Sequence, residues 1–279
     1  MDLSDILNGA IDRLDAKPPA APAQRLLDVM LARLKSRAEE SAKPPVQTAA
    51  DKQLYLRASQ VHEVLQNLNI WKAEIRPFPD LLKRPTPPPL GSQLTFDMGH
   101  ALHDWYRENY LQDVLYGEWI CTECGDTYTG LLQDFPKTEE CHDGRPHHPE
   151  FYESFVALPK LRLGGHPDGL VAFTAGPPAD VLEIKTASTS TWEKLTGPTE
   201  DHLTQTHVYM EATGLKSVLF VYIDKGRQTD WAWRDGELRP VGDPHIKTFQ
   251  AHFEPKRWAD ISKGVNDFWT LYEAKTKAP

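Results

Sequence analysis

Three side chains that could act together on a phosphate ester lie in two short segments of the sequence. Asp168 belongs to HPDGLVAF, and Glu183 and Lys185 belong to VLEIKTAS. Carboxylate oxygens are the ligands that Mg²⁺ and Mn²⁺ prefer, and a bound ion of this kind activates water for attack on phosphorus. A lysine beside them can position that water or neutralise the developing negative charge. These three residues are our candidates for catalysis.

The spacing of Glu183 and Lys185 is that of one face of a β-strand. Side chains two positions apart on a strand point to the same side, so Ile184 between them is expected to face a core. Glu-x-Lys pairs also occur on ordinary surface strands. On these residues alone, an active site and a solvated strand remain equal alternatives.

A second group of candidate ligands lies between residues 117 and 150. The chain has only three cysteines, Cys121, Cys124 and Cys141, and they are followed by His142, His147 and His148. Three thiolates and one histidine form the closed tetrahedral site that structural zinc prefers. We expect His147 or His148 to be the fourth ligand, because His142 adjoins Cys141 and adjacent residues rarely reach the same ion. Three free cysteines in a loop are the alternative.

The apolar pattern predicts the elements that must position these residues. We expect helices over residues 92–115, 199–213 and most of 247–275, and strands over 151–163, 166–173, 180–186 and 216–223, with 229–233 pairing with the last of these. Gly214 is expected to end its helix, and residues 117–150 to have little regular structure. The order helix, three strands, helix, strand predicts a mixed α/β core, in which helices flank a central sheet.

Composition limits the classes of function. The chain has 279 residues, 40% of them hydrophobic and 25% charged, as in ordinary globular proteins. No apolar run reaches the length of a membrane span, and no secretion signal is visible, so we expect a bacterial or phage-infected cytoplasm. The formal net charge of −9 excludes binding to DNA through overall basic charge.

The first 50 residues form a separate region in this interpretation. Two short helical patterns, 3–14 and 24–40, are separated and followed by the proline-rich segments KPPAAPA and SAKPPVQ, which end helices and stiffen linkers. We expect a helical N-terminal arm over 1–50, either mobile or docking a partner protein, and a main domain over 51–279 with a Cys/His insertion at 117–150.

The series of motifs resembles the PD-(D/E)xK superfamily, and within it the RecB-like nucleases. Pro167-Asp168, Glu183 and Lys185 match the signature of the superfamily. Upstream, GHALH at residues 99–103 resembles the GxxxH motif on the first helix. Downstream, QTHVY at residues 205–209 resembles the QxxxY motif on the helix after the ExK strand. The likeness covers about residues 92–223, and the arm and the cysteine segment lie outside it.

This resemblance implies a restriction-endonuclease-like αβββαβ core and a role for each matched residue. Mg²⁺ or Mn²⁺ would be bound by His103, Asp168, Glu183 and the carbonyl of Ile184. Lys185 would be the catalytic lysine, and Gln205 and Tyr209 would line the site and touch the DNA backbone or the lysine. His100 and His166 are weaker candidates for supporting the site.

The activity implied is that of a metal-dependent DNA nuclease in recombination, repair or bacteriophage DNA processing. The preference for an exonuclease comes from the resemblance and not from any spacing. An endonuclease for branched or specific DNA is one alternative, and a non-catalytic DNA- or protein-binding module on a retained scaffold is another. The arm could bind a recombination or replication protein. Some RecB-like nucleases carry an iron–sulfur cluster on four cysteines, which makes such a cluster a rival to zinc here.

Overall fold

The structure is a computed structural model of the chain. It describes residues 35, 54–67, 75–77, 89–135, 141, 147–173, 176–226, 230–234, 237–241 and 246–276. The chain divides into two compact units, Met1–Lys52 with Pro77–Leu102, and Gln53–Arg76 with His103–Pro279. The predicted arm lies outside the described residues except for Lys35, which is helical.

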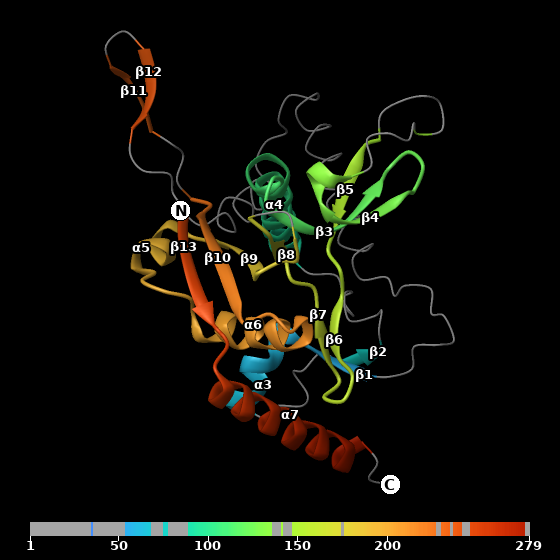
Figure 1. Cartoon of the computed structure of the whole chain (residues 1–279). Coiled ribbons are helices and arrows are strands. Elements are labelled where there is room, and N and C mark those ends of the chain that lie inside the picture. The colour runs from blue at the N-terminus through green and yellow to red at the C-terminus, as the bar shows by residue number, and fades with distance from the viewer. Residues whose placement is uncertain are drawn as a thin grey trace. The chain divides into compact units, whose positions relative to one another are not determined.

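A mixed sheet forms the centre of the second unit (Figure 1). Its strands are β3 (Leu115–Cys121), β4 (Thr127–Leu131), β5 (Pro149–Tyr152), β8 (Gly169–Val171), β9 (Asp180–Ala187), β10 (Ser217–Asp224) and β13 (Ile246–His252). They lie in the order β13-β10-β9-β8-β3-β4, and β5 also pairs with β3. Strands β9 and β10 are parallel, whereas β8 runs antiparallel to both β3 and β9.

The predicted mixed α/β fold is confirmed, because helices flank mixed sheets. Helix α4 (Leu90–Tyr106) is followed by strands β3 to β9, then by α5 (Thr189–Lys194), α6 (Glu200–Thr213) and β10. The expected order of helix, three strands, helix, strand is too simple, because most of β3, all of β4 and the start of β5 lie where we expected little regular structure. Helix α6 ends as predicted, because Gly214 adopts a φ of 77°, which an L side chain disfavours.

Two apolar cores cover the two faces of β9 and β10. Strand alternation sends Val181 to the core that also contains α6, and Leu182 and Ile184 to the opposite core. Ile184 is fully buried, as expected. Glu183 and Lys185 therefore share the face of the sheet that α6 covers.

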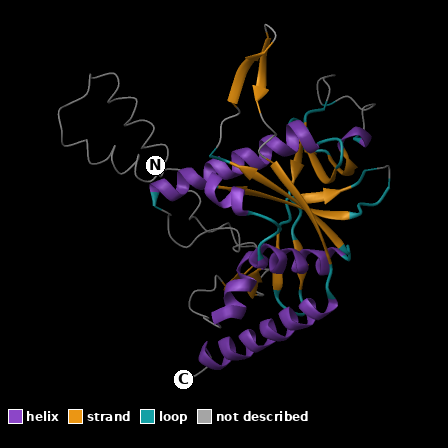
Figure 2. Cartoon of the chain, turned by 90° about the vertical axis from the view of Figure 1, so that its left-hand side faces the viewer, coloured by secondary structure: helices purple, strands orange, loops and turns teal. Residues whose placement is uncertain are grey.

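Helices α3 (Val61–Asn67), α6 and α7 (Pro255–Thr276) pack together against the first of these cores. Figure 2 shows them side by side (purple) below the long strands (orange). The buried residues Val61, Val208 and Phe268 contribute one apolar side chain from each helix to this core. Within the part of the chain that the structure describes, no helix is both long and apolar enough to cross a bilayer.

A smaller sheet and a separate ribbon complete the strands. The smaller sheet contains β1 (Leu54–Arg57), β2 (Ile75–Pro77), β6 (Val156–Leu158) and β7 (Leu163–Gly165), in the order β2-β1-β7-β6. The ribbon pairs β11 (Asp230–Arg234) with β12 (Glu237–Val241). The prediction that 229–233 pairs with 216–223 is therefore wrong, since β13 lies beside β10 instead.

The predicted strand over 151–163 is also wrong as a single element, because a turn divides it. Between β6 and β7, Leu161 N–H donates to the Leu158 carbonyl, and Arg162 adopts a φ of 51°. Gly164 and Gly165, which separate the two predicted strands 151–163 and 166–173, lie in β7. The predicted strand over 166–173 is reduced to β8.

Two further segments differ from expectation. Residues 117–150 contain most of β3, all of β4 and the start of β5, although we expected little regular structure there. The predicted helix over 247–275 begins later, with α7 at Pro255, because residues 246–252 alternate between half-buried and exposed side chains along strand β13.

His207 joins α6 to the chain segment that leads into α7. Its ring is fully buried, Nδ1 lies 2.7 Å from the Leu203 carbonyl oxygen, and Nε2 accepts a hydrogen bond from Glu254 N–H at 3.1 Å. Burial lowers the pKa of His207 below its ordinary value, so the ring is neutral and Nε2 is free to accept.

We expect His207→Ala to lower the free energy of unfolding by about 2 kcal/mol, because it leaves a cavity and an unpaired Glu254 N–H. Urea denaturation measures this. His252→Ala on β13 removes an exposed histidine and is the matched control. Equal losses in the two variants would contradict the role given to His207.

Candidate active site and metal centre

Buried Glu183 and partly buried Lys185 form an ion pair on one face of β9. The side chain of Glu183 is 3% exposed, and Lys185 Nζ lies 2.5 Å from its Oε1. Burial raises the pKa of Glu183 to about 7, although the charge of Lys185 opposes this. Burial lowers the pKa of Lys185, but the charges of Glu183 and Asp168 outweigh it, and the net shift is upward. The lysine is therefore held in its protonated form.

We expected Asp168 to lie within a strand. It lies instead just before β8. Its Oδ2 accepts a hydrogen bond of 2.6 Å from the backbone N–H of Ile184, which fixes the carboxylate against β9. Burial raises the pKa of Asp168, but His103, Lys185 and the Ile184 N–H together lower it below its ordinary value. Asp168, from the residue before β8, and Glu183, from β9, thus reach one region of the sheet.

His103 is in the last turn of α4, and its Nδ1 lies 3.1 Å from Asp168 Oδ1. Burial lowers the pKa of His103, but the hydrogen bond and the charge of Asp168 raise it by more, so the net pKa is raised. The other helix histidine, His100, is exposed and belongs to the first compact unit.

Gln205 and Tyr209 lie one helical turn apart on α6, and Gln205 links Tyr209 to the lysine. Lys185 Nζ donates to Gln205 Oε1 at 3.2 Å, and Gln205 Nε2 donates to the Tyr209 hydroxyl at 2.9 Å. Tyr209 is 3% exposed and packs so closely on Gly165 that an added Cβ there would lie 3.0 Å from its hydroxyl. The pair is thus placed to orient Lys185.

Arg107 is a neighbour of this site that the sequence analysis missed. It follows α4 directly, is 7% exposed, and donates to Glu153 and Asp104. A signal was present in the sequence, since Arg107 is four positions after His103 and shares its helical face. His166 Nδ1 lies 2.7 Å from the Glu153 carbonyl oxygen, so this weaker candidate is tied to the same segment.

The chemistry of the donors fits a divalent cation at Asp168 and Glu183. Among the described residues, Glu183 Oε2 is a buried acceptor without a hydrogen-bond partner. A cation near this oxygen would satisfy it and offset the burial of a second carboxylate. The ligand atoms of His103, Asp168 and Glu183 are not all within 4.8 Å of one another, so binding one ion through all three would require these side chains to move closer together.

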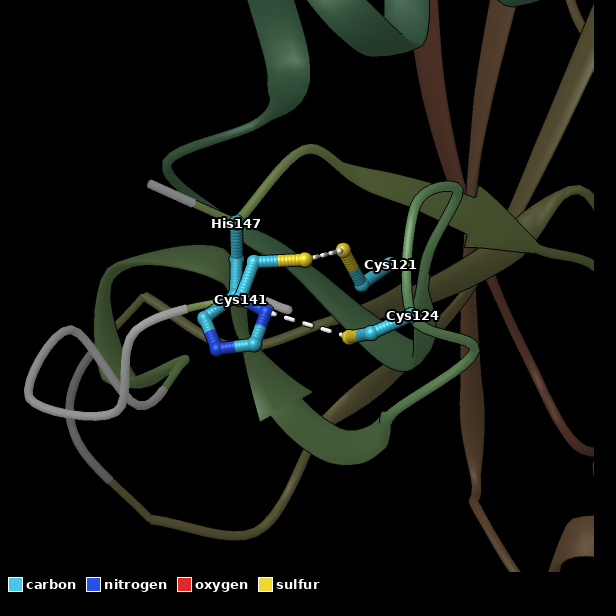
Figure 3. A group of neighbouring side chains, drawn as sticks. All are labelled: Cys121, Cys124, Cys141 and His147. Atoms are coloured by element: carbon cyan, nitrogen blue, oxygen red, sulfur yellow. Dashed lines mark hydrogen bonds between the residues drawn. The ribbon is translucent and has the colours of Figure 1, made fainter. Parts of the chain in front are cut away.

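The three cysteines and His147 converge in a second cluster (Figure 3). Their ligand atoms all lie within 4.8 Å of one another, with 3.9 Å between the Sγ atoms of Cys121 and Cys141 and 3.5 Å between Cys124 Sγ and His147 Nδ1. Within the described part of the chain, no other group of three or more such ligands is as close. This arrangement is consistent with structural zinc.

A tight turn of the backbone prepares this cluster. Gly125 N–H donates to the Cys121 carbonyl at 2.9 Å, and its φ of 79° requires glycine-like freedom. Burial raises the pKa of Cys121, but hydrogen bonds from nearby backbone N–H groups and His147 lower it to about 5, which favours the metal-binding thiolate. His148 is exposed and outside the cluster, which leaves His147 as its fourth member.

Comparisons with known proteins give only distant likenesses. No protein-family model and no curated protein matches the chain. Similar solved structures include the alkaline exonuclease LHK-Exo from Laribacter hongkongensis, with 21% identity over 80% of this chain and 90% of that chain and a TM-score of 0.45. LHK-Exo in complex with dAMP has 20% identity over the same shares and a TM-score of 0.43. SSO0001 has 12% identity over 87% of this chain and 86% of that chain and a TM-score of 0.39. Similarity at this level assigns no activity to this chain, so its function is inferred from its own residues.

His202, on the same helix as Gln205, makes the stability of the folded protein depend on pH. Its Nδ1 lies 2.7 Å from the Tyr222 hydroxyl, and Tyr222 is opposite Lys185 in the sheet. Burial and then the charge of Lys185 lower the pKa of His202 from 6.5 to about 4. The unfolded chain therefore takes up a proton at a higher pH than the folded chain, and acid favours unfolding.

We expect the stability that depends on neutral His202 to be complete above pH 6.5 and to be lost as the pH falls toward 4. His202→Gln cannot take up this proton, so it should lose less unfolding free energy than the wild type between about pH 7 and pH 5. Chemical denaturation at each pH measures the difference. Parallel losses in the two proteins would show that His202 does not carry this dependence.

Proposed function

We propose that the protein is a metal-dependent DNA nuclease, and within that class an exonuclease. One observation carries the proposal: Asp168 and Glu183 are buried beside a lysine that their charges keep protonated, and His103 contacts Asp168. Buried charges of this kind cost stability, and groups with such perturbed pKa values are concentrated at functional sites. The choice of an exonuclease rests on the resemblance of the motif series to RecB-like nucleases.

The proposed roles follow from the chemistry of each group. His103, Asp168, Glu183 and the carbonyl of Ile184 would hold Mg²⁺ or Mn²⁺. When bound, the ion would lower the pKa of a water molecule and offset charge on the phosphate. Lys185 would position the attacking water or stabilise negative charge on the phosphate oxygens. Gln205 would keep Lys185 in place, supported by Tyr209.

The acidity of the chain is compatible with DNA as the substrate. The net charge of −9 favours no general attraction to phosphate, so binding would depend on local contacts and on the metal ion. We propose a role in recombination, repair or phage DNA processing, with residues 1–50 available to bind a partner protein. These assignments rest on the resemblance described above.

We expect Asp168→Ala and Lys185→Ala to reduce DNA degradation by roughly 100-fold or more, because each removes a group that acts on the reacting phosphate. Degradation of end-labelled duplex with Mg²⁺ or Mn²⁺ measures this, and circular dichroism checks folding. Lys263→Ala, which removes a lysine that is 80% exposed on α7, is the control. Full activity in both site variants would contradict the proposal.

The same assay distinguishes an exonuclease from its alternatives. An exonuclease should degrade the linear duplex and leave a covalently closed circle intact. Cleavage of the circle would indicate an endonuclease. Binding of DNA without cleavage under either ion would indicate a non-catalytic module.

We also propose that Cys121, Cys124, Cys141 and His147 bind one structural Zn²⁺. Cys121 ends β3, and His147 lies just before β5, which pairs with β3 through Cys121 and Pro149. The ion would hold the end of β3 next to the start of β5. Three thiolates with one imidazole favour zinc, whereas an iron–sulfur cluster would need histidine in place of its fourth cysteine.

We expect protein purified without added metal to contain one zinc ion per chain, measured by elemental analysis. His147→Ala should lose zinc and melt at a lower temperature, because metal binding contributes directly to folding. His148→Ala, which alters the exposed neighbour, should keep zinc. Iron in place of zinc, absence of both metals, or loss of zinc only in His148→Ala would overturn the assignment.

A further inference from the structure

Arg107 is a buried cation beside the candidate active site with no part in the roles proposed so far. One guanidinium nitrogen, Nη1, donates to Glu153 and lies 3.4 Å from the main-chain oxygen of Asp168. The other, Nη2, donates to Asp104, and the guanidinium carbon is 5.6 Å from the centre of the Phe151 ring. Its donors are thus directed at the protein and not at solvent.

The contact with Asp168 gives that residue a third point of attachment. Its Oδ1 contacts His103, its Oδ2 accepts from Ile184 N–H, and its main-chain oxygen faces Arg107. The first two contacts orient the carboxylate, and the third fixes the backbone that carries it. Asp168 lies outside regular structure, just before β8, so strand hydrogen bonds do not hold it there.

The local structure of the helix end explains how Arg107 reaches this position. Arg107 begins a π-helical turn, Arg107–Leu111, directly after α4. Such turns are rare and often occur at functional sites. His103 and Arg107 are four positions apart and share a helical face, so one face contacts Asp168 at its carboxylate and at its main chain.

We propose that Arg107, held by Glu153, is a positioning residue that fixes the main chain of Asp168 so that its carboxylate can bind a divalent cation. This inference rests on the metal site of the proposed function. It assigns Arg107 no contact with DNA, because the side chain is 7% exposed and its donors are engaged within the protein. Residues that orient metal ligands affect affinity without touching the ion.

The test measures Mn²⁺ binding directly, by calorimetry on the full-length protein in its zinc-loaded form. We expect Arg107→Ala to weaken binding about 10- to 100-fold, and Asp168→Ala to abolish it. Added guanidinium ion, at a concentration that leaves the wild type folded, should restore part of the affinity of Arg107→Ala. Sodium at equal ionic strength should not.

Arg162→Ala is the matched control. Arg162 also pairs with a glutamate, Glu273, at 2.9 Å, and its guanidinium carbon lies 3.7 Å from the centre of the Trp269 ring. Arg162→Ala removes an ion pair and an aromatic contact like those of Arg107, but at a distance from the proposed metal site. Mn²⁺ affinity should therefore stay at the wild-type level. Wild-type affinity in Arg107→Ala, or an equal loss in Arg162→Ala, would overturn the positioning role.

A second variant keeps the test decisive if Arg107→Ala does not fold. Glu153 is partly exposed. Glu153→Ala removes the carboxylate that pairs with Arg107 and keeps the guanidinium of Arg107. Glu153→Ala should also weaken Mn²⁺ binding, by a smaller factor, and unchanged affinity would overturn the proposal.

Nuclease activity is measured separately. Wild-type protein that binds Mn²⁺ at Asp168 but leaves DNA intact would contradict the proposed function and not the positioning role.

Discussion

The burial of Glu183 is the constraint on which the site depends. A carboxylate with a side chain only 3% exposed destabilises a protein unless a nearby cation or donor compensates for it. Lys185 supplies that cation from the same face of β9, and Gln205 on α6 then holds the lysine. The compensation is incomplete, because Glu183 Oε2 is a buried acceptor without a partner among the described residues. A divalent cation near this oxygen would supply the partner that it lacks.

The two faces of β9 have different roles, one carrying the candidate catalytic side chains and the other packing into a core. One face of β9 carries Glu183 and Lys185, while Ile184 anchors the strand in the opposite core and its N–H holds Asp168. Strand β3 pairs with β8 near Asp168 and ends at Cys121 in the cysteine cluster. Strand β5 leads from the same cluster toward Glu153, which binds Arg107. The proposed zinc would thus stabilise the paired strands β3 and β5, which support the proposed catalytic metal site.

The sequence predicted best what depends on periodicity and motif order. The alternation of β9 and the end of α6 at Gly214 were both predictable, because each follows from local pattern. The cysteine cluster was predictable from its spacing, although the choice of His147 required the fold. Arg107 could not be assigned, because its partners Glu153 and Asp168 are distant in sequence. The place of β13 beside β10 was missed because edge pairing depends on tertiary contacts, which an alternating pattern of half-buried side chains does not specify.

The central claim is that a divalent cation binds where Asp168 and Glu183 meet. A crystal soaked in Mn²⁺, measured above and below the manganese absorption edge, tests this directly, because the anomalous difference locates the ion without assuming any activity. We predict a peak bounded by His103, Asp168, Glu183 and the Ile184 carbonyl. Absence of manganese from this position at saturating Mn²⁺ would contradict this prediction.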